Sequence, residues 1–209
     1  VTNMARVESL ACGLAHSCAV QADGKAWCWG RNNNGQLGDK SKVSRLNAVQ
    51  VTDLPPALSI HSGPSAEHTC AVVSGGELYC WGRNSHNQVS GGTPEPGFVE
   101  KVEGLKAPAI DVSAGRDHSC ALLTTGEMQC WGSNSNGQLG HIPPSGDPLR
   151  KSTVPIDVQV DKPVLSMSAG QLHSCAVLLG GRVRCWGWNQ YGQLGLAGYD
   201  PDDPQDVEQ

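Results

Sequence analysis

The chain has few aromatic side chains, no long apolar run and no basic cluster. Only 5% of its 209 residues are aromatic, with a single Phe. No segment approaches the roughly 20 consecutive apolar residues that a membrane-spanning helix needs. The formal net charge is −5, and lysine and arginine nowhere form the stripe that a nucleic-acid-binding surface needs. The sequence therefore predicts neither membrane insertion nor nucleic-acid binding.

The chain also lacks the short motifs that mark common catalytic sites. It contains no Gly-x-Ser-x-Gly nucleophile elbow, no Gly-rich phosphate loop and no His-Glu-x-x-His zinc motif. An active site normally breaks the symmetry of a repeat with one unique polar cluster, and the sequence shows none. We therefore expect a protein that is not an enzyme and that needs no cofactor.

Glycine, proline and cysteine are abundant instead, and a hairpin-sized phrase recurs four times. The counts are Gly 26, Pro 13 and Cys 9. The first cysteines of the four phrases lie 52, 50 and 55 residues apart, a period that suits a propeller blade. The phrases are HSCAVQADGKAWCWG (16–30), HTCAVVSGGELYCWG (68–82), HSCALLTTGEMQCWG (118–132) and HSCAVLLGGRVRCWG (173–187). Three phrases continue into a shared tail, NNNGQLG (32–38), NSNGQLG (134–140) and NQYGQLG (189–195), whereas the second tail, NSHNQVS (84–90), is degenerate.

Each period contains about four short strands separated by loops rich in Gly, Pro and Asn. Two strands come from the phrase itself. An innermost strand precedes each phrase, at Val7–Cys12, Ala57–Ser62, Ile110–Ala114 and Leu165–Ala169, and an outer strand follows three of them, at Ala48–Val51, Phe98–Val102 and Ile156–Val160. The sequence predicts an all-β fold, a β-propeller of four-stranded blades in one domain over residues 1–209, with repeats at about 7–56, 57–109, 110–164 and 165–209.

The turn in each phrase sets the register of its hairpin. A three-residue loop ending in Gly is typical of a type I turn followed by a left-handed residue. With the loop at Ala22-Asp23-Gly24, Gln21 pairs with Lys25 and Cys18 faces Cys28. If the pair next to the loop is hydrogen-bonded, the cysteine pair is non-hydrogen-bonded, where Cα atoms approach to about 4.5 Å. We therefore expect one cross-strand disulfide per hairpin: Cys18–Cys28, Cys70–Cys80, Cys120–Cys130 and Cys175–Cys185.

Two alternatives to these disulfides stay open, zinc binding and reduced thiols. His16, Cys18 and Cys28 fall on one face of the first hairpin, and Cys/His clusters bind zinc. Zinc ligands usually come in closer pairs, such as Cys-x2-Cys, which favours disulfides and no metal. Persistent disulfides indicate an oxidising compartment.

The ninth cysteine and the repeated histidines have simple structural interpretations. Cys12 occupies the position of Ala114 and Ala169, so we expect a small buried side chain, with an intermolecular disulfide as the alternative. Each repeat histidine stands at the start of a strand, where burial and a hydrogen bond to backbone are expected. The repeat tryptophans, Trp29, Trp81, Trp131 and Trp186, are expected to pack between blades.

The succession Gly-x-x-His, Gly turn, Trp-Gly-x-Asn-x-x-Gly-Gln-Leu-Gly resembles the regulator of chromosome condensation repeat. The third repeat carries it from Gly115 to Gly140, and the first and fourth match equally well. The second departs, with two extra residues between Gly63 and His68 and with a degenerate tail. Paired cysteines are absent from the intracellular pattern of this family and look like its secreted branch.

The resemblance implies a propeller that usually has seven blades. Only four repeats are present, so this chain is expected to be a fragment of a longer one, with another outer strand beginning in Pro204–Gln209. Members act mainly by protein–protein contact, among them an exchange factor for a nuclear GTPase, a plant photoreceptor, domains of ubiquitin ligases and kinases, and a secreted inhibitor of β-lactamase.

These observations together predict a secreted or cell-surface propeller that binds another protein or copies of itself, as a scaffold or part of a larger assembly. The alternative is a regulator of an enzyme, either a secreted hydrolase inhibitor or, with less support, a GTPase exchange factor, whose intracellular location the paired cysteines disfavour. Binding would rest on loop side chains at the rims. Arg and Trp are favoured interface anchors, so the expected interface residues are Arg31, Arg83, Arg116 and Trp188.

Overall fold

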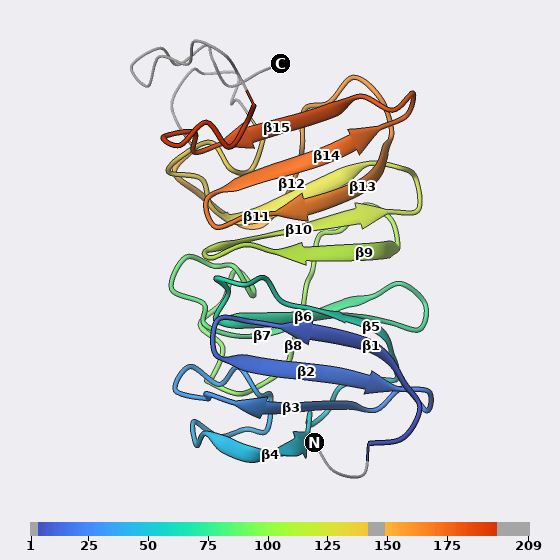
Figure 1. Ribbon diagram of the computed structural model, residues 1–209, viewed down its shortest axis with the longest axis vertical. Helices are drawn as coiled ribbons and strands as arrows, with labels where there is room; N and C mark the ends of the chain where they lie inside the picture. The colour runs from blue at the N-terminus through green and yellow to red at the C-terminus, as the bar shows by residue number, and fades with distance from the viewer. Residues whose placement is uncertain (1–3, 142–148, 196–209) are drawn as a thin grey trace.

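A computed structural model describes residues 4–141 and 149–195 and contains four antiparallel sheets that follow one another along the molecule (Figure 1). The described residues contain no helix, and so no helix suited to crossing a membrane. Each sheet is one predicted repeat, and its strands are hydrogen-bonded in chain order. The all-β prediction is confirmed. The expected outer strand near Pro204 lies outside the described residues, and the seven-bladed ring and the longer chain stay predictions.

Blades 1 and 2 are complete four-stranded sheets. Blade 1 contains β1 (Val7–Cys12), β2 (His16–Gln21), β3 (Ala26–Gly30) and β4 (Arg45–Gln50). Blade 2 contains β5 (Ala57–His61), β6 (His68–Val73), β7 (Leu78–Gly82) and β8 (Glu100–Lys101).

Blade 3 is also four-stranded, and blade 4 has three strands among the described residues. Blade 3 contains β9 (Ala109–Ala114), β10 (His118–Leu123), β11 (Met128–Ser133) and β12 (Lys151–Asp157). Blade 4 contains β13 (Val164–Ala169), β14 (His173–Leu178) and β15 (Val183–Gly187).

The inner strands are close to their predicted bounds, whereas the outer strands are not. β4 and β12 begin three and five residues before the predicted Ala48 and Ile156, and β8 is only two residues long. The outer strand pairs on one side only, and its register shifts against β3 and β11. Its ends therefore depend on contacts with the neighbouring loop rather than on an alternating pattern.

The predicted hairpin register is confirmed in all four blades. In blade 1 the Gln21 N–H donates to the Lys25 carbonyl over 3.0 Å, and Gly24 has φ of 79°. Cys18 then pairs with Cys28, and the other hairpins have the same register. Paired cysteines have Cα atoms 4.0–4.1 Å apart, and each pair is joined by a disulfide.

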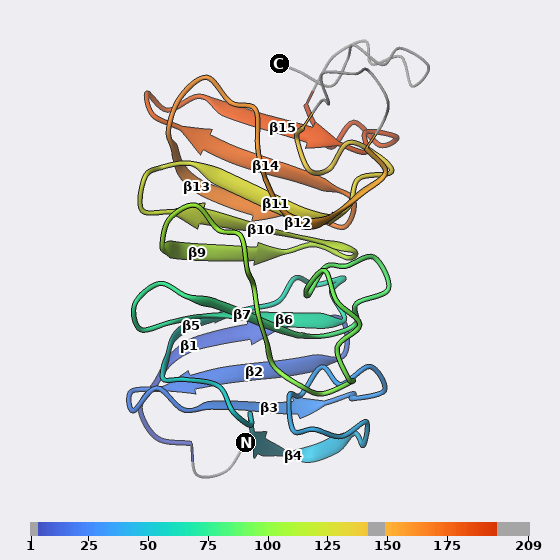
Figure 2. The same ribbon diagram turned by 180° about the vertical axis from the view of Figure 1, so that it is seen from behind.

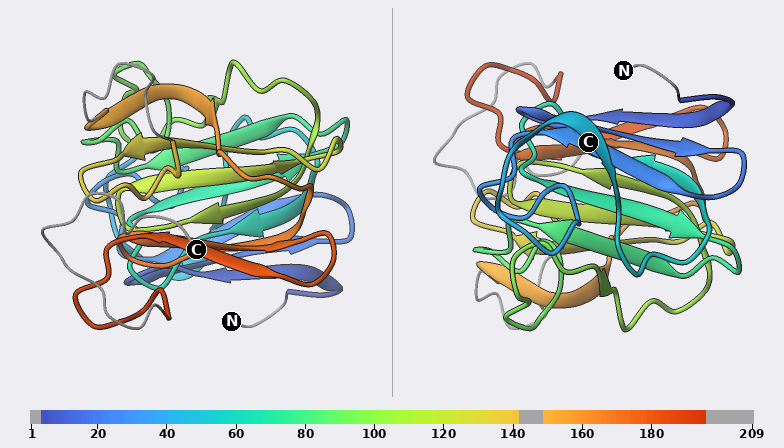
Figure 3. Two further views of the ribbon diagram at one scale, coloured as in Figure 1. Left: turned by 90° about the horizontal axis from the view of Figure 1, so that it is seen from above. Right: turned by 90° about the horizontal axis from the view of Figure 1, so that it is seen from below.

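The blades are arranged so that their inner strands are neighbours and their outer strands lie away from one another. β1 lies beside β5, β5 beside β9, and β9 beside β13, as the view from behind also shows (Figure 2). Seen from above and below, the sheets are turned relative to one another, as in consecutive blades of a propeller (Figure 3). Blade 1 and blade 4 form the two ends of this stack.

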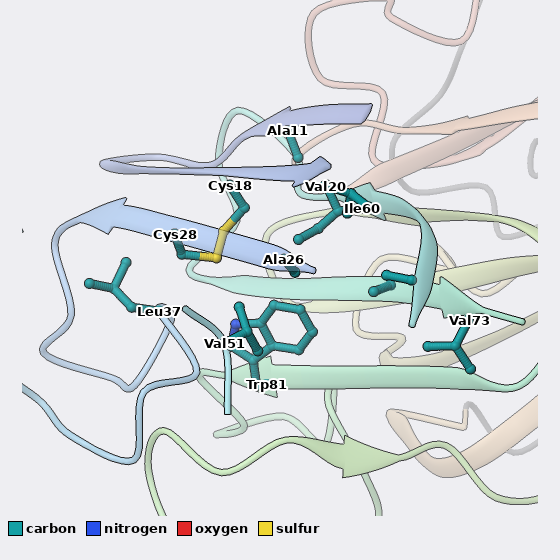
Figure 4. Packing of buried hydrophobic residues seen from close by; sticks show 12 residues of the cluster. Ala11, Cys18, Val20, Ala26, Cys28, Leu37, Val51, Ile60, Val73 and Trp81 are labelled. Carbon is teal, nitrogen blue, oxygen red and sulfur yellow. A yellow bond between two sulfur atoms is a disulfide. The ribbon is translucent and has the colours of Figure 1, made fainter. Parts of the chain in front are cut away.

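The hydrophobic core lies between blades, and one tryptophan fills each junction. Trp81 of β7 packs against the blade 1 face that carries the Cys18–Cys28 disulfide, Val20 and Ala26 (Figure 4). Trp131 packs on blade 2 and Trp186 on blade 3 in the same way. These three tryptophans are buried, whereas Trp29 of blade 1 is only half-buried because none of the described blades covers its face. Both faces of an internal blade are therefore packed, as expected for a propeller.

Polar contacts fix each junction in the same way. The indole N–H of Trp131 donates to the Gln88 carbonyl over 2.9 Å, and the Ser119 hydroxyl donates to the same oxygen over 2.8 Å. Trp81 and Trp186 have equivalent bonds to Gln36 and Gln138. The Gln in the tails of blades 1, 2 and 3 thus offers its backbone carbonyl to the next blade, which explains why this Gln recurs with the tryptophan even in the degenerate second tail.

The Gly-x-x-His motif has a steric cause. A Cβ on Gly115 would lie 2.2 Å from the His118 ring, and a Cβ on Gly13 would lie 2.1 Å from the His16 ring. Any other residue at these positions would occupy the place of the imidazole. The glycine is therefore needed for the histidine to fold back into the junction.

Two predictions about single residues are wrong. Three of the repeat histidines, His16, His68 and His118, are buried, and His173 is half-buried. The Nε2 atoms of the three buried rings lie 2.8 Å from hydroxyls of the next blade rather than from backbone atoms; the partners are Thr69, Ser119 and Ser174. Cys12 is exposed, although Ala114 and Ala169 are buried. The alanines face a preceding blade, and the position of Cys12 at the start of the stack leaves its thiol uncovered.

Candidate functional site

The residue after each Trp-Gly pair lies on one rim of the blades. Its backbone N–H donates to the carbonyl of the residue before the repeat histidine. The bonds are Arg31 to Ala15 (2.8 Å), Arg83 to Glu67 (2.9 Å), Ser133 to Asp117 (2.8 Å) and Trp188 to Leu172 (2.9 Å). This rim is at the end of the blades opposite to the hairpin turns, on the left of Figure 1. Three of the four predicted interface residues therefore stand at equivalent places, and Arg116 lies in the adjacent loop.

Glu67 joins the first two blades at this rim. Its carboxylate contacts an Nη atom of Arg31 of blade 1 at 3.2 Å and of Arg83 of its own blade at 3.3 Å. The two guanidinium groups are thereby held on either side of one carboxylate.

Asp117 repeats this arrangement one blade further on. Its carboxylate lies 3.5 Å from Arg83 and 3.6 Å from Arg116. His86 Nδ1 is 3.4 Å from the same group, and the Gln88 amide donates to it over 3.4 Å. Arg83 lies between both carboxylates, so a continuous series of ion pairs crosses blades 1, 2 and 3. We call Arg31, Glu67, Arg83, Asp117 and Arg116 the arginine rim.

The arginine rim presents its cations outward and its anions inward. The carboxylate side chains are 11–15% exposed, whereas those of Arg31 and Arg116 are 45% and 46% exposed and that of Arg83, between the carboxylates, is 28% exposed. Ion pairs of such exposure contribute roughly 0.2–1 kcal/mol each, so they add little to stability. Their main effect is to hold flexible guanidinium groups in place, which lowers the entropy lost when a partner binds. The rim is suited to binding carboxylates.

Trp188 does not join the arginine rim. Ser133 occupies the equivalent position in the intervening blade 3 and is buried. The Trp188 ring packs edge-to-face on Tyr191, with centroids 5.2 Å apart, and Tyr191 is strongly exposed. Of the four predicted interface residues, the three arginines thus cluster, and Trp188 lies apart and pairs with Tyr191.

Glu67 and Asp117 were missed by reasoning from the sequence. The available signal was the residue before the repeat histidine, which is acidic in the second and third repeats and apolar in the first and fourth. An acidic residue there becomes informative only once it is known that this position faces the residue after Trp-Gly.

The buried histidines form no reaction centre. Burial lowers the pKa of His16 to about 4 and lowers the pKa of His68 and His118 to about 3, so these rings are neutral at physiological pH. Each is enclosed at an equivalent junction, out of reach of a substrate. Within the described residues, no group of three His, Cys, Asp or Glu side chains is arranged to hold a metal ion.

Family comparison finds the regulator of chromosome condensation (RCC1) repeat four times in this chain. The matched segments are 7–36, 65–88, 109–138 and 164–193. A second form of the same repeat matches residues 23–72 and 125–177. Three of the first set of segments span the inner strand, hairpin and most of the tail of a blade, and 65–88 spans the hairpin and most of the tail of blade 2 without its inner strand.

Among individual proteins, the ultraviolet-B receptor UVR8 of Arabidopsis thaliana is 30% identical over 196 residues, covering 92% of this chain and 43% of the receptor. The solved structure of human WBSCR16 superposes with a TM-score of 0.80 at 22% identity, over 93% of this chain and 52% of that one. Prp20p of Saccharomyces cerevisiae, reported with its binding to Gsp1p and histones, has a TM-score of 0.76 at 24% identity, over 94% and 48%. The chain thus spans about half the length of these proteins, and the two structures support the propeller fold.

Proposed function

Because the chain belongs to the regulator of chromosome condensation repeat family, we propose that it is a non-catalytic propeller module that binds another protein through its arginine rim, in an oxidising compartment. The observation that carries the binding role is the series of ion pairs across three blades. Prp20p, a structural relative, binds the proteins Gsp1p and histones. A rigid scaffold with recognition groups on its rim loops is a common design for binding proteins.

The chemistry of the rim specifies the partner class. The guanidinium groups of Arg31 and Arg116 are about half exposed and that of Arg83 is partly exposed, whereas the two carboxylates are nearly buried, so the exposed face is positive on a chain whose formal net charge is −5. Guanidinium groups bind carboxylates in a bidentate geometry that lysine cannot provide. The partner is therefore a protein surface or extended segment rich in Asp and Glu.

The proposal that this protein works in an oxidising compartment rests on its disulfides. All eight cysteines of the hairpins are paired, and stable disulfides of this kind persist in secreted and cell-surface proteins and are rare in the cytosol. This location favours a secreted or cell-surface binding module over an exchange factor for an intracellular GTPase.

The rim can be tested with a fluorescent Glu-rich peptide and two triple variants of equal charge change. In R31Q/R83Q/R116Q the rim loses its guanidinium groups, and in the control K25Q/K162Q/R182Q three exposed cations near the hairpin turns are removed. We expect at least a tenfold loss of peptide affinity in the first variant and less than a twofold change in the second. Equal losses in both variants, or no binding of the peptide by the unmodified chain, would contradict the proposal.

A further inference from the structure

The tail of blade 2, residues 84–90, departs from the other tails in sequence but not in backbone shape. Asn87 has φ of 65°, in the same left-handed region as the 78° of Gly35 at the equivalent place of blade 1. The backbone N–H of His86 donates to the Gln88 side chain over 2.8 Å, and the equivalent bond of blade 1 has the same length. The tail therefore differs mainly in the side chain that it presents before the left-handed residue. This side chain is an imidazole in blade 2, whereas the counterparts in the other blades are Asn34, Asn136 and Tyr191.

His86 lies against the arginine rim, where blade 2 meets blade 3. Its Nδ1 atom is 3.4 Å from the Asp117 carboxylate and 3.2 Å from the Ser85 hydroxyl. The Ser85 hydroxyl in turn accepts a hydrogen bond from Arg83 Nε over 3.0 Å. The His86 side chain is nevertheless 42% exposed. The imidazole is thus held beside a carboxylate and a guanidinium group of the rim while it stays open to solvent.

The charged groups around His86 come from two elements. Arg83 directly precedes the tail that carries His86, and Asp117 and Arg116 belong to the loop before β10 of blade 3. Glu67 is joined to this group through Arg83. The guanidinium groups carry a fixed charge. Protonation of His86 would therefore add a cation to a cluster that already holds three cations and two carboxylates.

Five of the seven histidines are protected from protonation by burial. Burial lowers the pKa of each of these rings, which are His16, His61, His68, His118 and His173. His141 is the remaining one besides His86, and its Nδ1 atom lies 3.1 Å from the Asp157 carbonyl oxygen. Asp157 pairs with Gln129 at the end of β12 that is remote from the rim. Among the histidines, His86 is therefore the one placed to change the charge of the rim.

We propose that His86 makes the arginine rim pH-dependent, because on taking up a proton it becomes a fourth cation of the rim and tightens the binding of an acidic protein segment. This inference rests on the binding role proposed for the rim. Three guanidinium groups and two carboxylates give a net charge of +1, and an imidazolium raises it to +2. An imidazolium donates from both ring nitrogens, so Nδ1 can keep Asp117 while Nε2 offers a second N–H to a partner carboxylate.

The direction of the effect follows from linkage. A partner carboxylate near the ring favours its charged form, so binding of the partner is accompanied by uptake of a proton from solvent. Lowering the pH therefore strengthens binding, by the same coupling through which binding favours protonation. Histidine is the side chain that ordinarily changes charge between about pH 5 and 8. The acidic partner is held more tightly in mildly acidic surroundings and released toward neutral pH.

The test is the affinity for the fluorescent Glu-rich peptide at about pH 7.5 and about pH 6, at constant ionic strength. The peptide keeps its charge over this range, since an exposed Glu has a pKa of about 4.3. We expect the unmodified chain to bind roughly threefold to fivefold more tightly at the lower pH, as one additional exposed ion pair allows. H86Q retains a neutral hydrogen-bonding group and should lose most of this increase. Tryptophan fluorescence at both pH values verifies that each variant is folded.

Two further variants separate the charge of His86 from its packing. H86R carries a fixed cation and should bind the peptide tightly at both pH values, with little pH response. H141Q removes a histidine remote from the rim and should respond to pH like the unmodified chain. A full pH response in H86Q, or an equal response in all variants, would overturn this inference while the rim keeps its binding role. If the unmodified chain fails to bind the peptide at either pH, the proposed function fails together with it.

Discussion

At the scale of single residues, the buried histidines are the groups most sensitive to pH. Burial lowers the pKa of His68 and His118 to about 3, well below the value near 6.5 of an exposed histidine. Protonation would also place a charge in a junction whose neighbouring hydroxyl is already held by a Gln carbonyl, as at Ser119. The fold therefore depends on neutral rings.

We predict that stability falls on acidification below about pH 6.5. Between that pH and the folded pKa values the unfolded chain binds more protons than the folded chain, so each deeply buried histidine lowers the free energy of unfolding by about 1.4 kcal/mol per pH unit. Urea denaturation at pH 7, 6 and 5 would measure this slope. His118→Gln should make the slope shallower whatever its baseline stability, and an unchanged slope would contradict the assignment.

We predict one free thiol in the unreduced chain. Cys12 is exposed and the eight other cysteines are in disulfides, so one equivalent of a maleimide should react both in native buffer and in denaturant. After reduction, intact mass should show nine additions. C12S should take up none before reduction, and additional labelling of unreduced chain in denaturant would mean that a hairpin disulfide is absent.

At the scale of the element, the stabilising unit is the junction rather than the single blade. Each core cluster combines the disulfide face of one blade with the tryptophan of the next. A hairpin disulfide ties its own two strands, whereas the indole bond to a Gln carbonyl ties two sheets. A repeat tryptophan therefore contributes more to stability where its indole packs on another described blade than where it does not.

We predict that W131F is destabilising and that W29F is nearly neutral. The first variant removes a 2.9 Å bond to Gln88 and leaves a small cavity, together about 2 kcal/mol. Trp29 is half-buried without an acceptor among the described residues, so its replacement should cost less than about 0.5 kcal/mol. Chemical denaturation of both variants at one concentration would compare them directly. Equal losses would contradict the role assigned to the indole bond.

At the scale of the whole molecule, the fold is a one-dimensional stack in which each blade contacts its neighbours. In such arrays stability is approximately a sum of unit and junction contributions, and the end units are the least protected. Among the described residues, blades 2 and 3 have two junctions each, while blades 1 and 4 have one.

We predict a matching gradient of amide protection. Hydrogen exchange should be slowest in β6 and β10 and faster in β1 and β15, because opening blade 1 or blade 4 breaks one of the described junctions and opening blade 2 or blade 3 breaks two. Hydrogen exchange followed by mass spectrometry would resolve this at the level of single hairpins. Uniform protection across the four blades would show that the stack unfolds as one unit.

The sequence by itself determined the repeat, the hairpin register and the pairing of the cysteines. These are local properties: a three-residue loop and a period of two decide which residues of one hairpin face each other. The Cys18–Cys28 opposition therefore follows from counting outward from Gly24. The family resemblance has the same origin, since it consists of the turn, cap and junction residues of a single blade.

Only the tertiary structure decided what each face of a blade meets. The hydroxyl partners of the histidines and the joining of Arg31 to Glu67 depend on residues of a neighbouring blade, and Cys12 is exposed because no described blade covers it. The residues that make these contacts recur in the sequence, but the repeat does not say which blade each of them faces, because equivalent residues have different neighbours in different blades. For the same reason Trp29 and Trp131, alike in sequence context, differ in burial and in hydrogen bonding.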